Sequence, residues 1–160
     1  MADTHLSEPD SLTLHLEQDP LLRSTIVAVA VLDRTPDWER FVEAIDRATR
    51  LEPNFRRRLI PGPNPLIPAR WVDDPAFDLT WHLRRVGAPS PGTLAEVLEI
   101  ARVAGTSAFD PIRPRWEFTL VEGLADGTAA LVMKVHHALT DGIGGIQLAQ
   151  HAYVHPCSRP

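Results

Sequence analysis

Residues 128–145 read TAALVMKVHHALTDGIGG, and this stretch decides the predicted fold. Its first eight residues are mostly apolar and follow the turn signal Asp126-Gly127, which predicts a buried strand. Residues 116–121, WEFTLV, provide the first arm of the same hairpin. After the strand comes the pattern HHxxxDG, and residues 146–153 have the composition of a helix. The predicted order is therefore a strand, a short loop that carries histidines and an aspartate, and a helix.

The two adjacent histidines, His136 and His137, indicate acid–base chemistry. Successive side chains of a strand point to opposite faces, so the two imidazoles should not share one cavity, and spacing alone does not say which one works. A neutral imidazole near pH 7 can accept a proton from an attacking alcohol. There is no GxSxG motif, and the only cysteine, Cys157, lies in a Pro-rich tail. Direct attack on an activated ester, such as a thioester, fits better than a covalent intermediate.

Structural and metal-binding interpretations of the same residues remain open. An adjacent histidine pair is often one packed and one solvated residue, and Asp141 before Gly142 is a common cap or turn. A metal site would combine His136, His137 and Asp141 with histidines farther along the chain, His151 and His155. Neighbouring histidines on a strand diverge, and no cysteine pair adds ligands, so we predict that no metal is bound.

Other segments predict a layered α/β domain. Helices are expected near residues 12–17 and over 38–51 and 93–104, and an extended Pro-rich loop over 60–68. In the last of these helices, the predicted buried residues are Leu94, Val97, Leu98 and Ala101. Residues 24–32 should form a strand, and their apolar run is too short to cross a bilayer and predicts a central position in the sheet.

Composition limits the expected partners and cellular compartment of the protein. The chain has 160 residues, enough for one core of ordinary domain size, and a net charge of -5, which argues against nucleic acid as the main partner. A single cysteine is typical of a reducing compartment, and the N-terminus lacks the basic and apolar regions of a secretory signal. We therefore expect a cytoplasmic protein.

Several blocks of sequence together resemble one family. They are LSEPD at 6–10, FRRRL at 55–59, FDLTWHLR at 77–84 and WEFTLVEGL at 116–124, followed by HHxxxDG. In this order they resemble the N-terminal half of the bacterial wax ester synthase/acyl-CoA:diacylglycerol acyltransferase family, over about residues 6–152. The motif alone would also suit condensation domains of nonribosomal peptide synthesis, whereas the flanking blocks favour the wax ester synthase branch.

The resemblance implies a fold and a reaction. The fold is that of the CoA-dependent acyltransferases (chloramphenicol acetyltransferase-like), with two similar α/β halves and a tunnel between them. His137 would be the general base that deprotonates a diacylglycerol or fatty-alcohol hydroxyl, which then attacks a long-chain acyl-CoA. Asp141 would shape the loop, Gly142 would permit its turn, and His136 would support them. Acyl-CoA is then a co-substrate, no cofactor is expected, and contact with a membrane or lipid-inclusion surface would be peripheral.

Two departures qualify the resemblance. Arg115 stands where the family commonly has the leucine of Pro-Leu-Trp, which affects either acyl-chain specificity or local packing. Residues 153–160 match nothing in the family, so we expect an N-terminal half-domain over 1–152 and a truncation near 153–160. An inactive half-domain that binds lipid or self-associates, and condensation-type acyl transfer, are the alternative functions.

The arginine cluster 56–58 and three tryptophans also allow more than one interpretation. The arginines suit a clamp for the phosphates of CoA, although a solvated helix end is the commoner role. Trp71, Trp81 and Trp116 are expected to be core residues or walls of an acyl tunnel.

Overall fold

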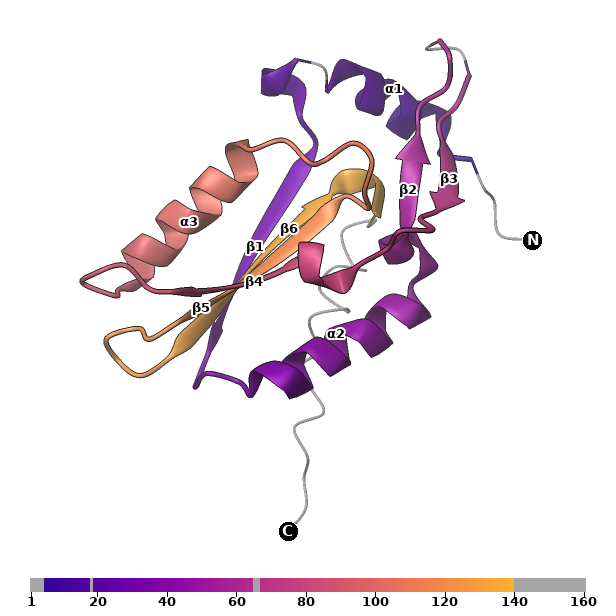
Figure 1. The fold of residues 1–160 in the computed structure, drawn as a ribbon. Coiled ribbons are helices and arrows are strands. Elements are labelled where there is room, and N and C mark those ends of the chain that lie inside the picture. The colour runs from indigo at the N-terminus through magenta and orange to yellow at the C-terminus, as the bar shows by residue number, and fades with distance from the viewer. Residues whose placement is uncertain (1–4, 18, 65–66, 140–160) are drawn as a thin grey trace.

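A mixed four-stranded sheet forms the centre of the molecule (Figure 1). The computed structural model describes residues 5–17, 19–64 and 67–139. The strands lie in the order β1 (Thr25–Leu32), β6 (Ala129–His136), β5 (Trp116–Glu122) and β4 (Leu83–Gly87). β6 is antiparallel to both of its neighbours, whereas β4 and β5 are parallel.

The predicted hairpin around the histidine motif is confirmed. β5 and β6 pair from Trp116 opposite Val135 to Val121 opposite Ala130. The connection contains Gly123 at φ 73° and Gly127 at φ 80°. Both lie in the left-handed region that glycine adopts without strain, so the turn depends on residues that lack a Cβ. The pairing of β5 with β6 therefore fixes where β6 ends.

β6 is buried along its whole length and contributes to two cores. Leu131, Met133 and Val135 face one core, and Ala130 and Val132 face the other. This alternation follows from the two-residue period of a strand. It is the reason that nearly every residue from 129 to 135 is apolar.

β1 occupies an edge of the sheet in the described part of the chain, so the prediction of a central strand at residues 26–32 is wrong. Its side chains are mostly half-buried, because both faces of the strand pack against hydrophobic clusters. A continuous apolar run indicates that both faces of a strand are buried. It does not indicate whether the strand has a hydrogen-bonded neighbour on each side.

Helices cover both faces of the sheet (Figure 1). α3 (Leu94–Thr106) packs against one face, and α2 (Trp38–Leu51) lies on the other with α1 (Glu8–Leu16) above it. Thr93 begins α3 with a capping box in which Glu96 accepts hydrogen bonds from the Thr93 backbone N–H and hydroxyl. The predicted helices at 12–17, 38–51 and 93–104 are confirmed, except that the first one starts earlier.

The predicted buried face of α3 is wrong at two residues. Val97 and Ala101 are buried, but Leu94 and Leu98 are 48% and 52% exposed. The helix places a narrow stripe against the sheet, and the two leucines lie at its margin. They leave apolar surface on the outside of the molecule.

The remaining elements are short. β2 (Arg57–Ile60) and β3 (Arg70–Asp73) form an antiparallel hairpin beside α1, and the predicted loop over 60–68 joins them. The described part of the chain also contains four 3-10 helices, η1 (Pro20–Leu22), η2 (Pro53–Arg56), η3 (Leu79–Trp81) and η4 (His137–Leu139). No helix within the described ranges is both long and apolar enough to span a bilayer.

Candidate functional site

The main chain at the end of β6 is anchored on both sides. The backbone N–H of His136 donates to the carbonyl of Arg115 at 3.0 Å, and that of His137 donates to the carbonyl of Ser24 at 2.9 Å. β6 therefore ends between the segment before β5 and the segment before β1. His137 then begins the short helix η4.

His136 is buried, and both of its ring nitrogens face polar atoms. The backbone N–H of Ala138 donates to Nδ1 at 3.0 Å, so a neutral ring carries its proton on Nε2. Nε2 lies 2.7 Å from Oε1 of Glu17, close but not aligned as a hydrogen bond. The ring is therefore enclosed by the protein and poorly placed to take a proton from a substrate.

His137 is the accessible imidazole of the pair. Its side chain is 58% exposed, and Nδ1 lies 3.7 Å from a carboxylate oxygen of Asp10, too far for a hydrogen bond. β6 ends at His136, so the alternation of a strand does not extend to His137, and the two histidines differ in burial instead. Of the two imidazoles, His137 is the one exposed at the surface of the described structure.

Glu17 joins three segments that are distant in the sequence. It is the C-cap residue of α1, and its Oε1 accepts from the backbone N–H of Ser24 at 2.9 Å. Its Oε2 accepts from Nη1 of Arg115 at 3.0 Å. Burial raises the pKa of Glu17, but the contacts with His136, Ser24 and Arg115 outweigh burial, so the pKa lies below the ordinary 4.5. Glu17 is therefore ionised at neutral pH.

Arg115 has a local structural role in this chain. Its side chain is only 13% exposed, and burial lowers its pKa while the charge of Glu17 opposes that effect. A guanidinium keeps its proton at neutral pH even so. The arginine therefore balances the buried carboxylate, which accounts for a basic residue where an apolar one was expected.

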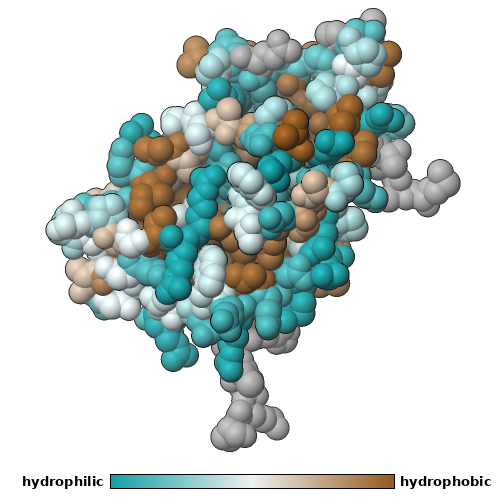
Figure 2. All heavy atoms as spheres, in the orientation of Figure 1, coloured by the Kyte–Doolittle hydropathy of each residue, from teal (hydrophilic) through white to brown (hydrophobic). Residues whose placement is uncertain are grey.

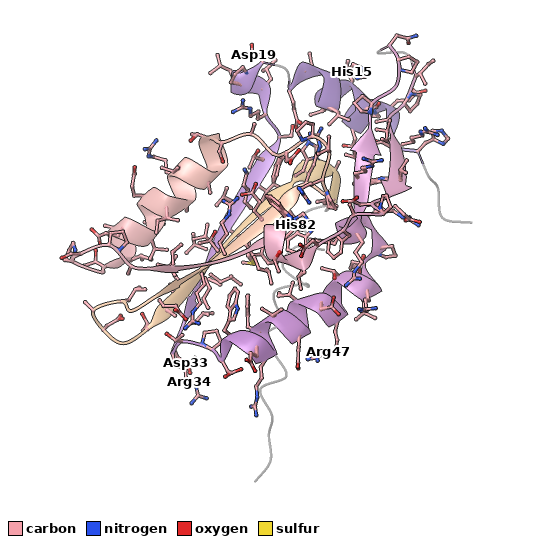
Figure 3. All side chains as sticks on the ribbon, viewed as in Figure 1. His15, Asp19, Asp33, Arg34, Arg47 and His82 are labelled. Carbon is pink, nitrogen blue, oxygen red and sulfur yellow. The ribbon has the colours of Figure 1, made fainter. Side chains whose placement is uncertain are left out.

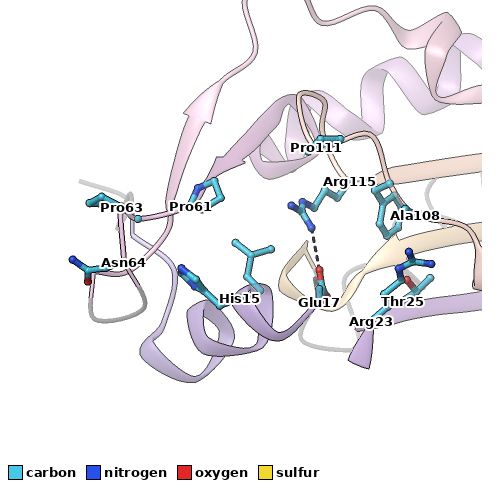
Figure 4. A pocket seen from close by; sticks show the side chains of 13 residues that line it. His15, Glu17, Arg23, Thr25, Pro61, Pro63, Asn64, Ala108, Pro111 and Arg115 are labelled. Atoms are coloured by element: carbon cyan, nitrogen blue, oxygen red, sulfur yellow. Dashed lines mark hydrogen bonds and ion pairs between the residues drawn. The ribbon is translucent and has the colours of Figure 1, made fainter. Parts of the chain in front are cut away.

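A cavity of about 670 Å³ opens beside this charge pair (Figure 4). Its wall is made of α1, the loop after β2, the start of β1 and residues 108–115. Glu17 and Arg115 lie next to each other in this wall, joined by their ion pair, and Arg23 and Phe109 also line the cavity. Its volume is in the range of small-molecule clefts. Neither imidazole of the motif lines it.

A third histidine, His82, belongs to the core. It stacks on the ring of Trp116 at a centroid distance of 4.5 Å, and its Nδ1 donates to the Trp116 carbonyl at 2.8 Å. Burial, the largest influence, lowers its pKa. Figure 3 shows His82 in the middle of the molecule, whereas Asp33, Arg34 and Arg47 lie at its periphery. His82 therefore has a structural role in the core, where it connects to the first residue of β5.

The predicted core role of the tryptophans holds for two of the three. Trp116 is fully buried and donates from Nε1 to the carbonyl of Phe55 at 2.8 Å, and Trp71 is buried as well. Trp81 is 56% exposed, and the guanidinium of Arg113 lies 4.0 Å above its ring.

Two of the three clustered arginines are paired within the protein. Arg56 pairs with Asp46 and also donates to the hydroxyl of Thr49 at 3.0 Å. Arg57 pairs with Asp73 at 2.8 Å. These pairs disfavour the interpretation of the cluster as a phosphate clamp, since both guanidinium groups already have carboxylate partners.

Part of the predicted site lies outside the described residues. This is true of Asp141, Gly142, the helix at 146–153, the boundary at 152, and the alternative metal ligands His151 and His155. Within residues 5–17, 19–64 and 67–139, no three His, Cys, Asp or Glu side chains are grouped so that they could hold a metal.

Comparison with known proteins places the chain in a family. Residues 6–156 match the wax ester synthase/diacylglycerol acyltransferase catalytic domain. The chain belongs to this family. A Mycobacterium tuberculosis H37Rv protein named as a diacylglycerol O-acyltransferase is 43% identical over 92% of the chain, and the match covers 30% of that relative. Another from the same strain is 36% identical over 90% of the chain and 32% of its own length.

A solved structure of this family and that of a more distant protein share the fold of the chain. The enzyme from Marinobacter aquaeolei VT8 superposes with a TM-score of 0.69 at 30% identity, over 92% of this chain and 37% of its own. The starter condensation domain of rhizomide synthetase gives 0.73 at 16% identity, over 93% and 36%, and shares the fold. Another structure of that domain is a complex with C8-CoA. The predicted acyltransferase fold is confirmed, and the chain spans about a third of the length of these proteins.

Proposed function

We propose that the protein is an O-acyltransferase that moves a long-chain acyl group from acyl-CoA to the hydroxyl of diacylglycerol or a fatty alcohol. The observation that carries the proposal is the accessible imidazole of His137, held at the end of the central strand β6 in a chain of this family. Relatives named for the same transfer support the acceptor class. The complex of a condensation domain with C8-CoA supports acyl-CoA as the donor.

The proposed step uses His137 as general base. Its neutral imidazole takes the proton of the acceptor hydroxyl while the hydroxyl oxygen bonds to the thioester carbonyl carbon. The C–S bond then breaks, and the proton passes from His137 to the departing CoA sulfur. The products are an ester and CoA thiol, with no cofactor consumed. Asp141 and Gly142 are proposed to shape the loop beyond η4.

The test replaces the matching third of the Mycobacterium tuberculosis relative with this chain. Palmitoyl-CoA is supplied with either dipalmitoylglycerol or hexadecanol, and ester and CoA thiol are both measured. We expect ester formation that falls at least about 10²-fold in His137→Ala, because a general base is removed. His5→Ala, an exposed histidine at the start of the chain, is the control and should keep the wild-type rate.

Other results would identify the alternative functions. Transfer from an acyl carrier protein thioester but not from acyl-CoA would indicate a condensation-type enzyme. Loss of activity in the fusion with both donors, while the relative itself is active, would indicate a non-catalytic domain. Ester formation at the normal rate in His137→Ala would overturn the assignment of the base.

We also propose that the protein contacts a membrane or lipid-inclusion surface through α3. Leu94, Leu98 and Val103 are 48%, 52% and 53% exposed, and Figure 2 shows hydrophobic side chains gathered over this helix. The proposed acceptors are themselves lipids. Flotation with phosphatidylcholine vesicles that contain diacylglycerol should recover the protein, and Leu98→Glu should lower the bound fraction about tenfold by removing apolar burial. Leu51→Glu, at an exposed leucine of α2, is the matched control, and equal losses in both variants would contradict a role for α3.

A further inference from the structure

We propose that Glu17 and Arg115 are positioning residues, which hold the proton of His136 on Nε2 and thereby fix the turn that presents His137. This inference rests on the proposed function of His137. It concerns the side chains behind the histidine pair, which make no contact with the imidazole of His137 in the described structure.

The first connection to the turn runs through the ring of His136. The Ala138 N–H donates to Nδ1 at 3.0 Å and so closes η4 around His137. This bond requires a lone pair on Nδ1, so the single proton of the neutral ring must sit on Nε2. The carboxylate of Glu17, 2.7 Å from Nε2, favours that form, because it attracts the N–H and would repel a lone pair.

The second connection runs through the backbone of Ser24. Oε1 of Glu17 accepts from the Ser24 N–H at 2.9 Å, and the carbonyl of the same residue accepts from the His137 N–H at 2.9 Å. The same carboxylate oxygen therefore contacts both His136 and Ser24, and each of these residues makes a hydrogen bond to η4. Loss of the carboxylate would therefore weaken the support of η4 through both His136 and Ser24.

Arg115 keeps this arrangement electrically balanced. A buried carboxylate without a cationic partner is strongly unfavourable, so Glu17 needs such a partner to stay beside His136. The bond from Nη1 of Arg115 to Oε2, at 3.0 Å, supplies it. The backbone carbonyl of Arg115 also accepts from the His136 N–H, so one residue steadies both the charge and the strand end.

The other charged groups around the site have different partners. Lys134 pairs with Glu117 at 3.6 Å and lies over the face of Phe109, whose ring stands edge-on to His136. Arg23 donates to the Thr106 carbonyl at 2.8 Å. Asp10 lies beside the imidazole of His137, and His15 lines the adjoining cavity. Glu17 is the carboxylate that contacts His136.

The test measures the histidine tautomers of the full 160-residue chain by long-range ¹H–¹⁵N NMR at pH 7. We expect His136 to be mainly in the Nε2–H form. Glu17→Gln should lower the ratio of Nε2–H to Nδ1–H about tenfold, because the negative charge beside Nε2 is lost. Arg115→Met should disturb the same signals, and Arg115→Lys, which keeps the charge, should restore them in part. Arg113→Met, at an arginine paired with Asp110, is the matched control.

Enzymatic measurements separate this inference from the proposed function. In the fusion with the mycobacterial relative, Glu17→Gln should lower kcat about tenfold with little change in KM, because positioning of the base is lost rather than substrate binding. A wild-type His136 in the Nδ1–H or doubly protonated form would overturn the inference without any variant. If the tautomers behave as expected but His137→Ala remains active, the proposed function fails and the positioning network stands.

Discussion

At the scale of single residues, the two motif histidines differ in burial and therefore in the expected effect of replacement. His136 is 2% exposed and accepts a backbone hydrogen bond, whereas the His137 side chain is 58% exposed. His136→Ala should destabilise the fold by about 2–4 kcal/mol, since it leaves a cavity and unpaired polar groups. His137→Ala should change stability by no more than about 0.5 kcal/mol. Urea unfolding of the two variants checks this, and equal losses would contradict the asymmetry.

Arg115 shows how one substituted residue acquires a partner. From sequence it stands out only as a basic residue beside Trp116, where the resemblance led us to expect an apolar one. In the structure its guanidinium meets Glu17, which lies 98 residues earlier in the chain. No local pattern could have indicated that pairing, because neither residue belongs to a periodic face or a spaced motif.

At the scale of elements, Glu17 ties the end of α1 to the ends of β1 and β6. Its pKa lies below the ordinary 4.5, so the unfolded chain binds the proton more readily than the folded one. The stability that the carboxylate contributes is therefore complete above the ordinary value and is lost as the pH falls through the folded pKa. Glu17→Gln should be less stable than the wild type at pH 7, and the difference should narrow as the pH falls below 4.5.

Urea unfolding of both proteins at a series of pH values measures this difference. Asp46, whose pKa is also lowered, is common to both proteins, so its contribution cancels. A difference in the free energy of unfolding that stays constant from pH 7 to well below the ordinary value would show that the carboxylate charge does not fasten α1 to the sheet.

At the scale of the whole molecule, two hydrophobic clusters on either side of one sheet hold the site in place. β6 contributes to both clusters, so its end is among the best-supported points of the fold. A wax ester synthase/diacylglycerol acyltransferase and a starter condensation domain share this fold with the chain, at TM-scores of 0.69 and 0.73, so the fold by itself does not specify a function.

Local sequence patterns by themselves determined the types of the main elements and the hairpin before the motif, and the order of several sequence blocks indicated the family. Hydrophobic periodicity and turn residues act over a few positions, so a single sequence displays them directly. Only the tertiary structure decided that β1 lies at an edge, that Leu94 and Leu98 face outward, and that His136 is the enclosed imidazole. It also brought Glu17 and Arg115 to that histidine. Such outcomes depend on which distant segments pack together, and the free energy of that packing belongs to the whole chain rather than to any one stretch of it.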